Sequence, residues 1–119
     1  MGKRTKRQVD PAGKVAIYGM IDPDEGKIVY VGSSRNLKGR LVVHTGEANS
    51  SYQKARKNKN PLYVWFRQVL ESGRTPELHP LEFCTEDTRN EREEWWIAHL
   101  RSIKTKLFNR RWVGTKTNY

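Results

Sequence analysis

Two short apolar runs, Val15–Ile21 and Lys27–Gly32, stand near the start of the chain and are rich in β-branched and aromatic residues. The segment between them reads Asp-Pro-Asp-Glu-Gly, which has strong turn chemistry, so the pattern predicts a β-hairpin. Both faces of these strands are largely apolar, which indicates a sheet covered by helices on each side. If Tyr18 pairs with Tyr30, both rings emerge on one face, because side chains alternate along a strand.

A first helix is predicted directly after the hairpin. Ser34 or Asn36 can cap it, and it runs to about Thr45, with Gly46 as its end. The stretch 48–58 that follows is polar and basic, and we interpret it as a loop or a frayed helical turn.

A second helix is predicted to begin at Asn60 with Pro61 and to end at Gly73. Its apolar residues recur at helical spacing, which is typical of ordinary core packing. They are Leu62, Trp65, Phe66, Val69 and Leu70.

A third strand and a third helix complete the pattern. The strand covers Leu78–Cys84, and Pro80 places it at an edge of the sheet, because proline cannot donate to a strand ladder. The helix runs from about residue 87 or 88 to Ser102, with Glu93 one turn before an apolar stripe, so we expect Glu93 to point toward the sheet. The stripe consists of Trp96, Ile97, Leu100 and Ile103.

These elements predict an α+β fold, with a small three-stranded antiparallel β-sheet flanked by helices. The expected organisation is one domain over residues 15–119, preceded by a flexible basic arm over residues 1–14. The arm has almost no apolar content to offset the entropy of ordering it. It serves either as a solubilising tail or as a segment that contacts a polyanion.

The charge balance narrows the class of partner. The 119 residues include 23 Lys and Arg against 13 Asp and Glu, giving a net charge of +10, which favours nucleic acid through counterion release. The sequence contains no lipidation motif, signal peptide or long apolar run, which argues against a membrane surface. The single cysteine, Cys84, cannot form an intramolecular disulfide, and we expect a buried thiol in a reducing, cytoplasmic setting.

Polar residues follow the hairpin at fixed offsets. Arg40 comes ten residues after Tyr30, and His44 follows one helical turn later. Glu93 lies in the segment Glu-Arg-Glu-Glu-Trp-Trp-Ile, and Asn109 closes the segment Leu-Phe-Asn. Either tyrosine triplet alone would occur by chance in many proteins, so the signal lies in the joint spacing.

Residues 16–109 resemble the GIY-YIG nuclease family in this spacing. Ala16-Ile17-Tyr18 stands for the first triplet and Tyr30-Val31-Gly32 for the second, with alanine in place of the first glycine. The resemblance implies a divalent-metal-dependent DNA endonuclease that hydrolyses phosphodiester bonds. The catalytic residues implied are Tyr18, Tyr30, Arg40, His44, Glu93 and Asn109.

The chemistry divides among these side chains. Glu93 is the expected ligand of Mg²⁺ or Mn²⁺, which prefer carboxylate oxygens and take their remaining ligands from water and phosphate. Arg40 offers a fork of donors to nonbridging phosphate oxygens. Tyr18 is expected to accept a proton from water, with its pKa lowered by a nearby cation or metal, while Tyr30 orients the water or phosphate. If the motif is disregarded, Glu93 would be an ordinary surface glutamate, and Tyr18 and Tyr30 would be strand residues packed in a core.

The resemblance also implies the roles of the two remaining catalytic residues. His44 holds the water or a tyrosine hydroxyl, and Asn109 braces the site through hydrogen bonds. Trp112 is expected to be a core residue that anchors the C-terminal tail. The expected DNA-binding cations are Lys3, Arg4, Lys6, Arg7, Lys54, Arg56, Lys57, Lys59, Arg110 and Arg111.

One active site cuts one strand at each visit, so nicking by a monomer, or cutting by a transient homodimer on DNA, is the expected mode. The short length fits a free-standing enzyme, either encoded by a phage or mobile element or related to restriction enzymes. The alternative function is a noncatalytic nucleic-acid-binding module with the same fold. An RNA-binding domain of the ribosomal kind would account for the charge, but not for the tyrosine spacing or Glu93.

Overall fold

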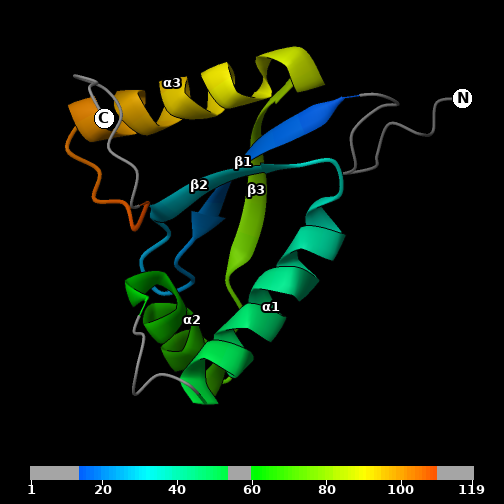
Figure 1. Ribbon diagram of the computed structural model, residues 1–119. Helices are drawn as coiled ribbons and strands as arrows, with labels where there is room; N and C mark the ends of the chain where they lie inside the picture. Colours follow the sequence, from blue (N-terminus) through cyan, green and yellow to red (C-terminus); the bar gives the residue numbers. More distant parts are fainter. Residues whose placement is uncertain (1–13, 54–59, 110–119) are drawn as a thin grey trace, which may run out of the picture.

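The structure, a computed structural model, describes residues 14–53 and 60–109, with backbone only over residues 50–53 (Figure 1). It has the predicted α+β architecture, with a three-stranded sheet and helices on both of its faces. The strands are β1 (Val15–Ile21), β2 (Ile28–Ser34) and β3 (Glu77–Cys84). The helices are α1 (Leu37–Gln53), α2 (Pro61–Glu71) and α3 (Arg89–Ser102), with a short 3₁₀ helix, η2 (Glu86–Thr88), before α3.

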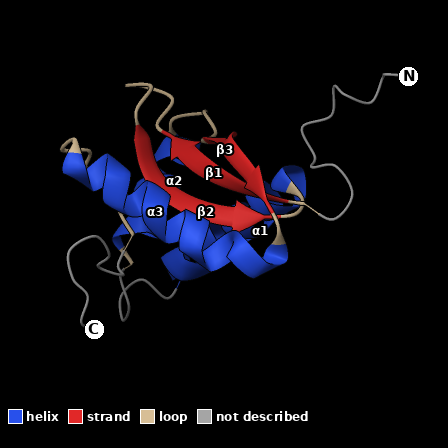
Figure 2. Cartoon of the chain, turned by 90° about the horizontal axis from the view of Figure 1, so that it is seen from above, coloured by secondary structure: helices blue, strands red, loops and turns tan. Residues whose placement is uncertain are grey.

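The sheet has the order β2-β1-β3, and both pairings are antiparallel, so β1 lies in the centre (Figure 2). Pro80 lies in β3 at an edge of the sheet, as predicted. The assumed pairing of Tyr18 with Tyr30 is wrong, because Tyr18 lies opposite Gly32 and Tyr30 lies opposite Met20. The difference is two residues, which keeps each side chain on its face, so both tyrosines still project to the same side of the sheet.

The helices form a layer on each face of the sheet. In Figure 1, α3 lies above the sheet and α1 with α2 lies below it. Ile17 and Val31 pack toward α3 with Ile97 and Leu100, whereas Met20 packs with residues of α1 and α2. The central strand is buried on both faces, as its apolar character predicts.

The predicted end of the first helix is wrong. Helix α1 continues through Gly46 to Gln53, so residues 48–53 are helical, and the rest of the predicted loop lies outside the described residues. Ala48 explains the extension, because its side chain is fully buried in a cluster with Met20, Leu62 and Phe66. Tertiary burial of this turn outweighs the cost of a glycine inside the helix, about 1 kcal/mol relative to alanine.

The ends of the other helices follow the sequence signals. The Asn60 side chain caps α2 by accepting a hydrogen bond from the Leu62 backbone, and Pro61 occupies the first helical position. Gly73 follows the helix with a positive φ of 87°, which glycine adopts at little cost. In α3 the predicted stripe fails at Ile103, which lies just after the last helical residue and is 58% exposed.

Candidate active site

The hydroxyl of Tyr18 lies in a buried position between two side chains of α1. Its oxygen is 2.8 Å from Nε2 of His44, and it also interacts by a hydrogen bond with Arg40. Tyr18 is only 1% exposed and His44 is fully buried. Arg40 and His44 are four residues apart and so lie on the same face of α1, which brings both to one tyrosine.

Gly32 makes this arrangement possible. It lies opposite Tyr18 in the sheet, and a Cβ atom at Gly32 would come within 2.4 Å of the Tyr18 hydroxyl oxygen. Because Gly32 has no side chain, it leaves room for the ring of Tyr18. This close approach gives a physical reason for glycine at the end of Tyr30-Val31-Gly32.

Burial raises the pKa of Tyr18 above its ordinary value of 10. The hydrogen bond and positive charge of Arg40 act in the opposite direction, while Tyr30 and Glu93 add to the rise. The prediction that a neighbouring cation lowers this pKa is therefore wrong for the protein alone, because desolvation outweighs Arg40. In this state Tyr18 is a neutral phenol that carries its proton.

His44 has the opposite shift. Burial, assisted by the positive charge of Arg40, lowers its pKa from 6.5 to about 4, so the imidazole is neutral at neutral pH. The Tyr30 ring packs edge-on against it, with ring centroids 5.8 Å apart. The structure thus brings Tyr18, Tyr30, Arg40 and His44 together, as the sequence spacing indicated.

Tyr63 is a member of this cluster that the sequence analysis did not single out. Its hydroxyl oxygen lies 3.0 Å from Nδ1 of His44, on the side of the ring away from Tyr18. Tyr63 belongs to α2, outside the spacing that identified the other residues. Its place one position after Leu62 in a helix expected to pack on the sheet was the only signal that could have drawn attention to it.

Glu93 approaches from α3, on the other face of the sheet. Its Oε1 accepts a hydrogen bond of 3.0 Å from the Ser33 hydroxyl at the end of β2, and Arg89 Nε donates to the same hydroxyl. The predicted direction of Glu93, toward the sheet, is therefore confirmed. Its negative charge also contributes to the raised pKa of Tyr18, so the two groups interact although they come from different layers.

Helix α3 is held in this position by Glu82 of β3. The Glu82 carboxylate accepts hydrogen bonds from Arg92 at 2.9 Å and from the Trp96 indole at 2.8 Å. Arg92 directly precedes Glu93, so a paired, planar guanidinium fixes the turn that carries the glutamate.

The donor set around Glu93 fits one hard divalent ion. Glu93 is half-buried, and within the described residues its second oxygen, Oε2, makes no hydrogen bond. The described residues contain no group of three or more His, Cys, Asp or Glu side chains able to hold a metal. An ion at Glu93 would therefore complete its shell with water and phosphate, as Mg²⁺ commonly does.

Asn109 contacts the backbone of β2. Its Oδ1 accepts from the Val31 amide at 2.9 Å, and its Nδ2 donates to the Val31 carbonyl at 2.8 Å. Arg101 donates to the Asn109 carbonyl at 2.7 Å. Asn109 thus completes the hydrogen bonding of an edge strand between Tyr30 and Gly32, and it makes no contact with Tyr18 or Glu93 through these bonds.

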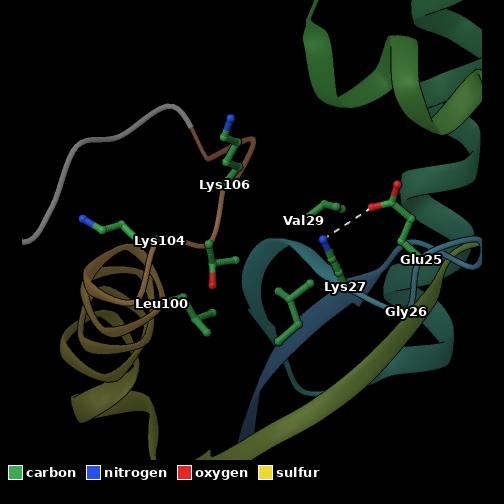
Figure 3. Close-up of a pocket in the computed structure, with 9 residues that line it drawn as sticks. Glu25, Gly26, Lys27, Val29, Leu100, Lys104 and Lys106 are labelled. Carbon is green, nitrogen blue, oxygen red and sulfur yellow. Dashed lines mark ion pairs between the residues drawn. The ribbon is translucent and has the colours of Figure 1, made fainter.

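A separate hollow of about 640 Å³ lies between the hairpin turn and the segment after α3 (Figure 3). Its lining includes Lys27, Lys104 and Lys106 around Val29 and Leu100, and it contains none of the candidate catalytic residues. Trp112 and the predicted DNA-binding cations lie outside the described residues. These cations are Lys3, Arg4, Lys6, Arg7, Lys54, Arg56, Lys57, Lys59, Arg110 and Arg111.

The chain matches a known protein family. The family described as GIY-YIG catalytic domain matches residues 14–109, which contain every residue of the cluster described above. Searches of curated proteins and of solved structures find no match to the chain. Among the described residues, no helix has the length and apolar character needed to cross a membrane.

Proposed function

The chain belongs to the GIY-YIG family, whose catalytic domain covers residues 14–109, and on this basis we propose that it is a DNA endonuclease dependent on Mg²⁺ or Mn²⁺. Family membership supports a nuclease, and nucleases of this family generally use divalent metals. The observation that carries the finer proposal is the buried Tyr18 hydroxyl held between His44 and Arg40, with its pKa also raised by the negative charge of Glu93.

Hydrolysis requires an activated water and stabilisation of charge on the phosphate and the leaving oxygen. Arg40 carries several donors, so it can bind a nonbridging phosphate oxygen while it still contacts Tyr18. Glu93 would hold the divalent ion, and a bound ion would supply positive charge for the departing 3′ oxygen and for the water.

The proton of the water passes to the Tyr18 oxygen while the Tyr18 proton passes to Nε2 of His44. The hydroxide forms a bond to phosphorus while the bond from phosphorus to the 3′ oxygen breaks. The 3′ oxygen leaves as an alkoxide that takes a proton from solvent water, so the products are a 5′ phosphate and a 3′ hydroxyl. Because burial raises the pKa of Tyr18, a resting phenolate is not populated, and the two proton movements must be coupled. Tyr30, which packs beside His44, would orient the water or the phosphate.

This chemistry acts on one strand at a time. One chain contains a single such cluster among its described residues, so we expect nicked circles as the first product from supercoiled plasmid. A double-strand break would need a second copy on the DNA or a second binding event.

The test is cleavage of supercoiled plasmid in Mg²⁺ by the wild type and by two glutamate variants of α3. Glu93→Ala should abolish cleavage, with DNA binding unchanged or slightly tighter, because it removes a metal ligand and a negative charge near phosphate. Glu91→Ala is the matched control, since Glu91 is exposed on the same helix, and it should cut normally. EDTA should stop the wild type.

Cleavage that persists in EDTA, or normal turnover by Glu93→Ala, would contradict the metal assignment. A wild type that binds DNA but cuts neither plasmid nor branched DNA in Mg²⁺ or Mn²⁺ would support the noncatalytic binding module instead.

A further inference from the structure

Tyr63 lies on the far side of His44 from the reacting tyrosine. The two ring nitrogens of His44 each face a phenol, with Nε2 at 2.8 Å from Tyr18 and Nδ1 at 3.0 Å from Tyr63. Three different elements, β1, α1 and α2, thus contribute to one chain of hydrogen bonds. The family spacing does not include α2, so Tyr63 has no assigned part in the reaction.

The donor and the acceptor of each hydrogen bond in this series can be assigned by elimination. A guanidinium only donates, so the Tyr18 oxygen accepts from Arg40. Tyr18 is almost fully buried, and among the described residues its other hydrogen-bond partner is His44. Its own proton must therefore point to Nε2, because a buried hydroxyl without an acceptor is costly.

A neutral imidazole with a bare Nε2 carries its proton on Nδ1. The low pKa of His44 keeps the ring in this neutral form at neutral pH. Nδ1–H then donates to the Tyr63 oxygen, which completes a chain running from Arg40 through Tyr18 and His44 to Tyr63.

We propose that Tyr63 is a positioning residue, whose hydroxyl oxygen accepts from Nδ1–H of His44 and so keeps Nε2 free to take the Tyr18 proton. This inference rests on the proposed function, since the proton acceptor matters only if Tyr18 relays a proton from water. When His44 becomes protonated, the same oxygen stabilises the imidazolium, which then donates from both nitrogens.

The groups that face His44 are consistent with this role. Arg40 disfavours its protonated form, while Tyr18, Tyr30 and Tyr63 are the titratable groups that pack against it from β1, β2 and α2. Burial raises the pKa of Tyr63, and the negative charge of Glu47 adds to this rise. Tyr63 therefore stays a neutral phenol and does not take the proton itself.

Tyr63→Phe removes only the hydroxyl. The ring of residue 63 can keep its packing against Phe66, with centroids 6.4 Å apart, so the fold should survive. Without an acceptor for Nδ1–H, the buried ring favours the other tautomer, in which Nε2–H faces Tyr18 and cannot accept. We expect kcat for plasmid nicking to fall by about 10- to 100-fold, with little change in the Kd for DNA.

The kinetic control is Val64→Ala, a neighbouring α2 position that is 40% exposed and should leave kcat unchanged. A Tyr63→Phe protein that nicks DNA at the wild-type rate would overturn the proposal while leaving the nuclease assignment intact. A raised Kd with normal kcat would overturn it too, because it would mean that Tyr63 contacts DNA. A wild type that fails to cut would instead overturn the nuclease assignment.

A second measurement does not depend on turnover. In protein labelled with ¹⁵N-histidine, the His44 ring should show a protonated Nδ1 and a bare Nε2 at pH 7, assigned by loss of the signals in a His44→Gln variant. Tyr63→Phe should shift this population toward Nε2–H. A protonated Nε2 in the wild type, or an unchanged tautomer in Tyr63→Phe, would overturn the proposal whatever the kinetics show.

Discussion

Replacing Gly32 with alanine tests how closely Tyr18 must be held. The added Cβ would lie 2.4 Å from the Tyr18 hydroxyl oxygen and 2.6 Å from ring carbon Cζ, whereas ordinary contact begins near 3.4 Å. The difference, 3.4 minus 2.4, requires a displacement of about 1 Å. Because the ring is 1% exposed and packed on all sides, its movement must disturb the 2.8 Å contact with His44.

Two magnitudes follow from this displacement. Forcing extra volume into a packed core costs about 1–3 kcal/mol of stability, which is tolerable for a domain. Misplacing a reacting group by about 1 Å can reduce a rate by roughly 100-fold. We therefore expect Gly32→Ala to remain folded, to bind DNA, and to nick plasmid about 100-fold more slowly than the wild type.

Gly46→Ala is the matched control. Gly46 lies inside α1, and a Cβ there would meet nothing within 4 Å, so the substitution should stabilise the helix by about 0.5–1 kcal/mol and leave nicking unchanged. The measurements are urea unfolding, DNA binding by anisotropy and initial nicking rate, made on all three proteins. A Gly32→Ala variant with wild-type activity would refute the argument that Tyr18 must be held in this position.

Three further predictions concern stability and binding. The pKa of His44 is lowered from 6.5 to about 4 on folding, so the unfolded chain binds this proton more readily. Stability should therefore be nearly constant above about pH 7 and fall by about 2 kcal/mol between pH 7 and pH 5, and urea titrations of His44→Gln should lack most of that fall. Asn109→Ala should cost about 1–3 kcal/mol in the same assay, because it leaves the amide and carbonyl of Val31 without partners; a loss below about 0.5 kcal/mol would contradict this. Deleting residues 1–8, in a Glu93→Ala background, should make the slope of log K against log salt shallower by up to about 3 to 4, and equal slopes would indicate that the arm does not contact DNA.

Much of the fold could be predicted from local signals. Three features follow from residues that restrict the backbone conformation or hydrogen bonding at their own positions. They are the hairpin, the edge position of Pro80 and the start of α2 at Asn60. The strand register could not be predicted this way, since pairing depends on how the turn closes. An error of two residues was harmless to the site, because it leaves Tyr18 and Tyr30 on the same face.

The predictions that failed depend on tertiary contacts. Gly46 resembles a helix end in isolation, but burial of Ala48 against Phe66 extends α1 by two further turns. The pKa of Tyr18 was expected to fall beside a cation, and burial, which no sequence pattern measures, reverses the direction. Tyr63 was overlooked because its contact with His44 requires α1 and α2 to pack together.

The shifted pKa values of Tyr18 and His44 connect substrate binding to catalysis. At rest, burial holds the proton on Tyr18 and disfavours its transfer to His44. The positive charge of Arg40 is one of the two causes of the lowered His44 pKa. When a DNA phosphate binds Arg40, its negative charge offsets that of the guanidinium, so His44 becomes a better proton acceptor. The cluster should therefore relay a proton readily only when phosphate is in place, and a free water at the empty site should stay unreactive.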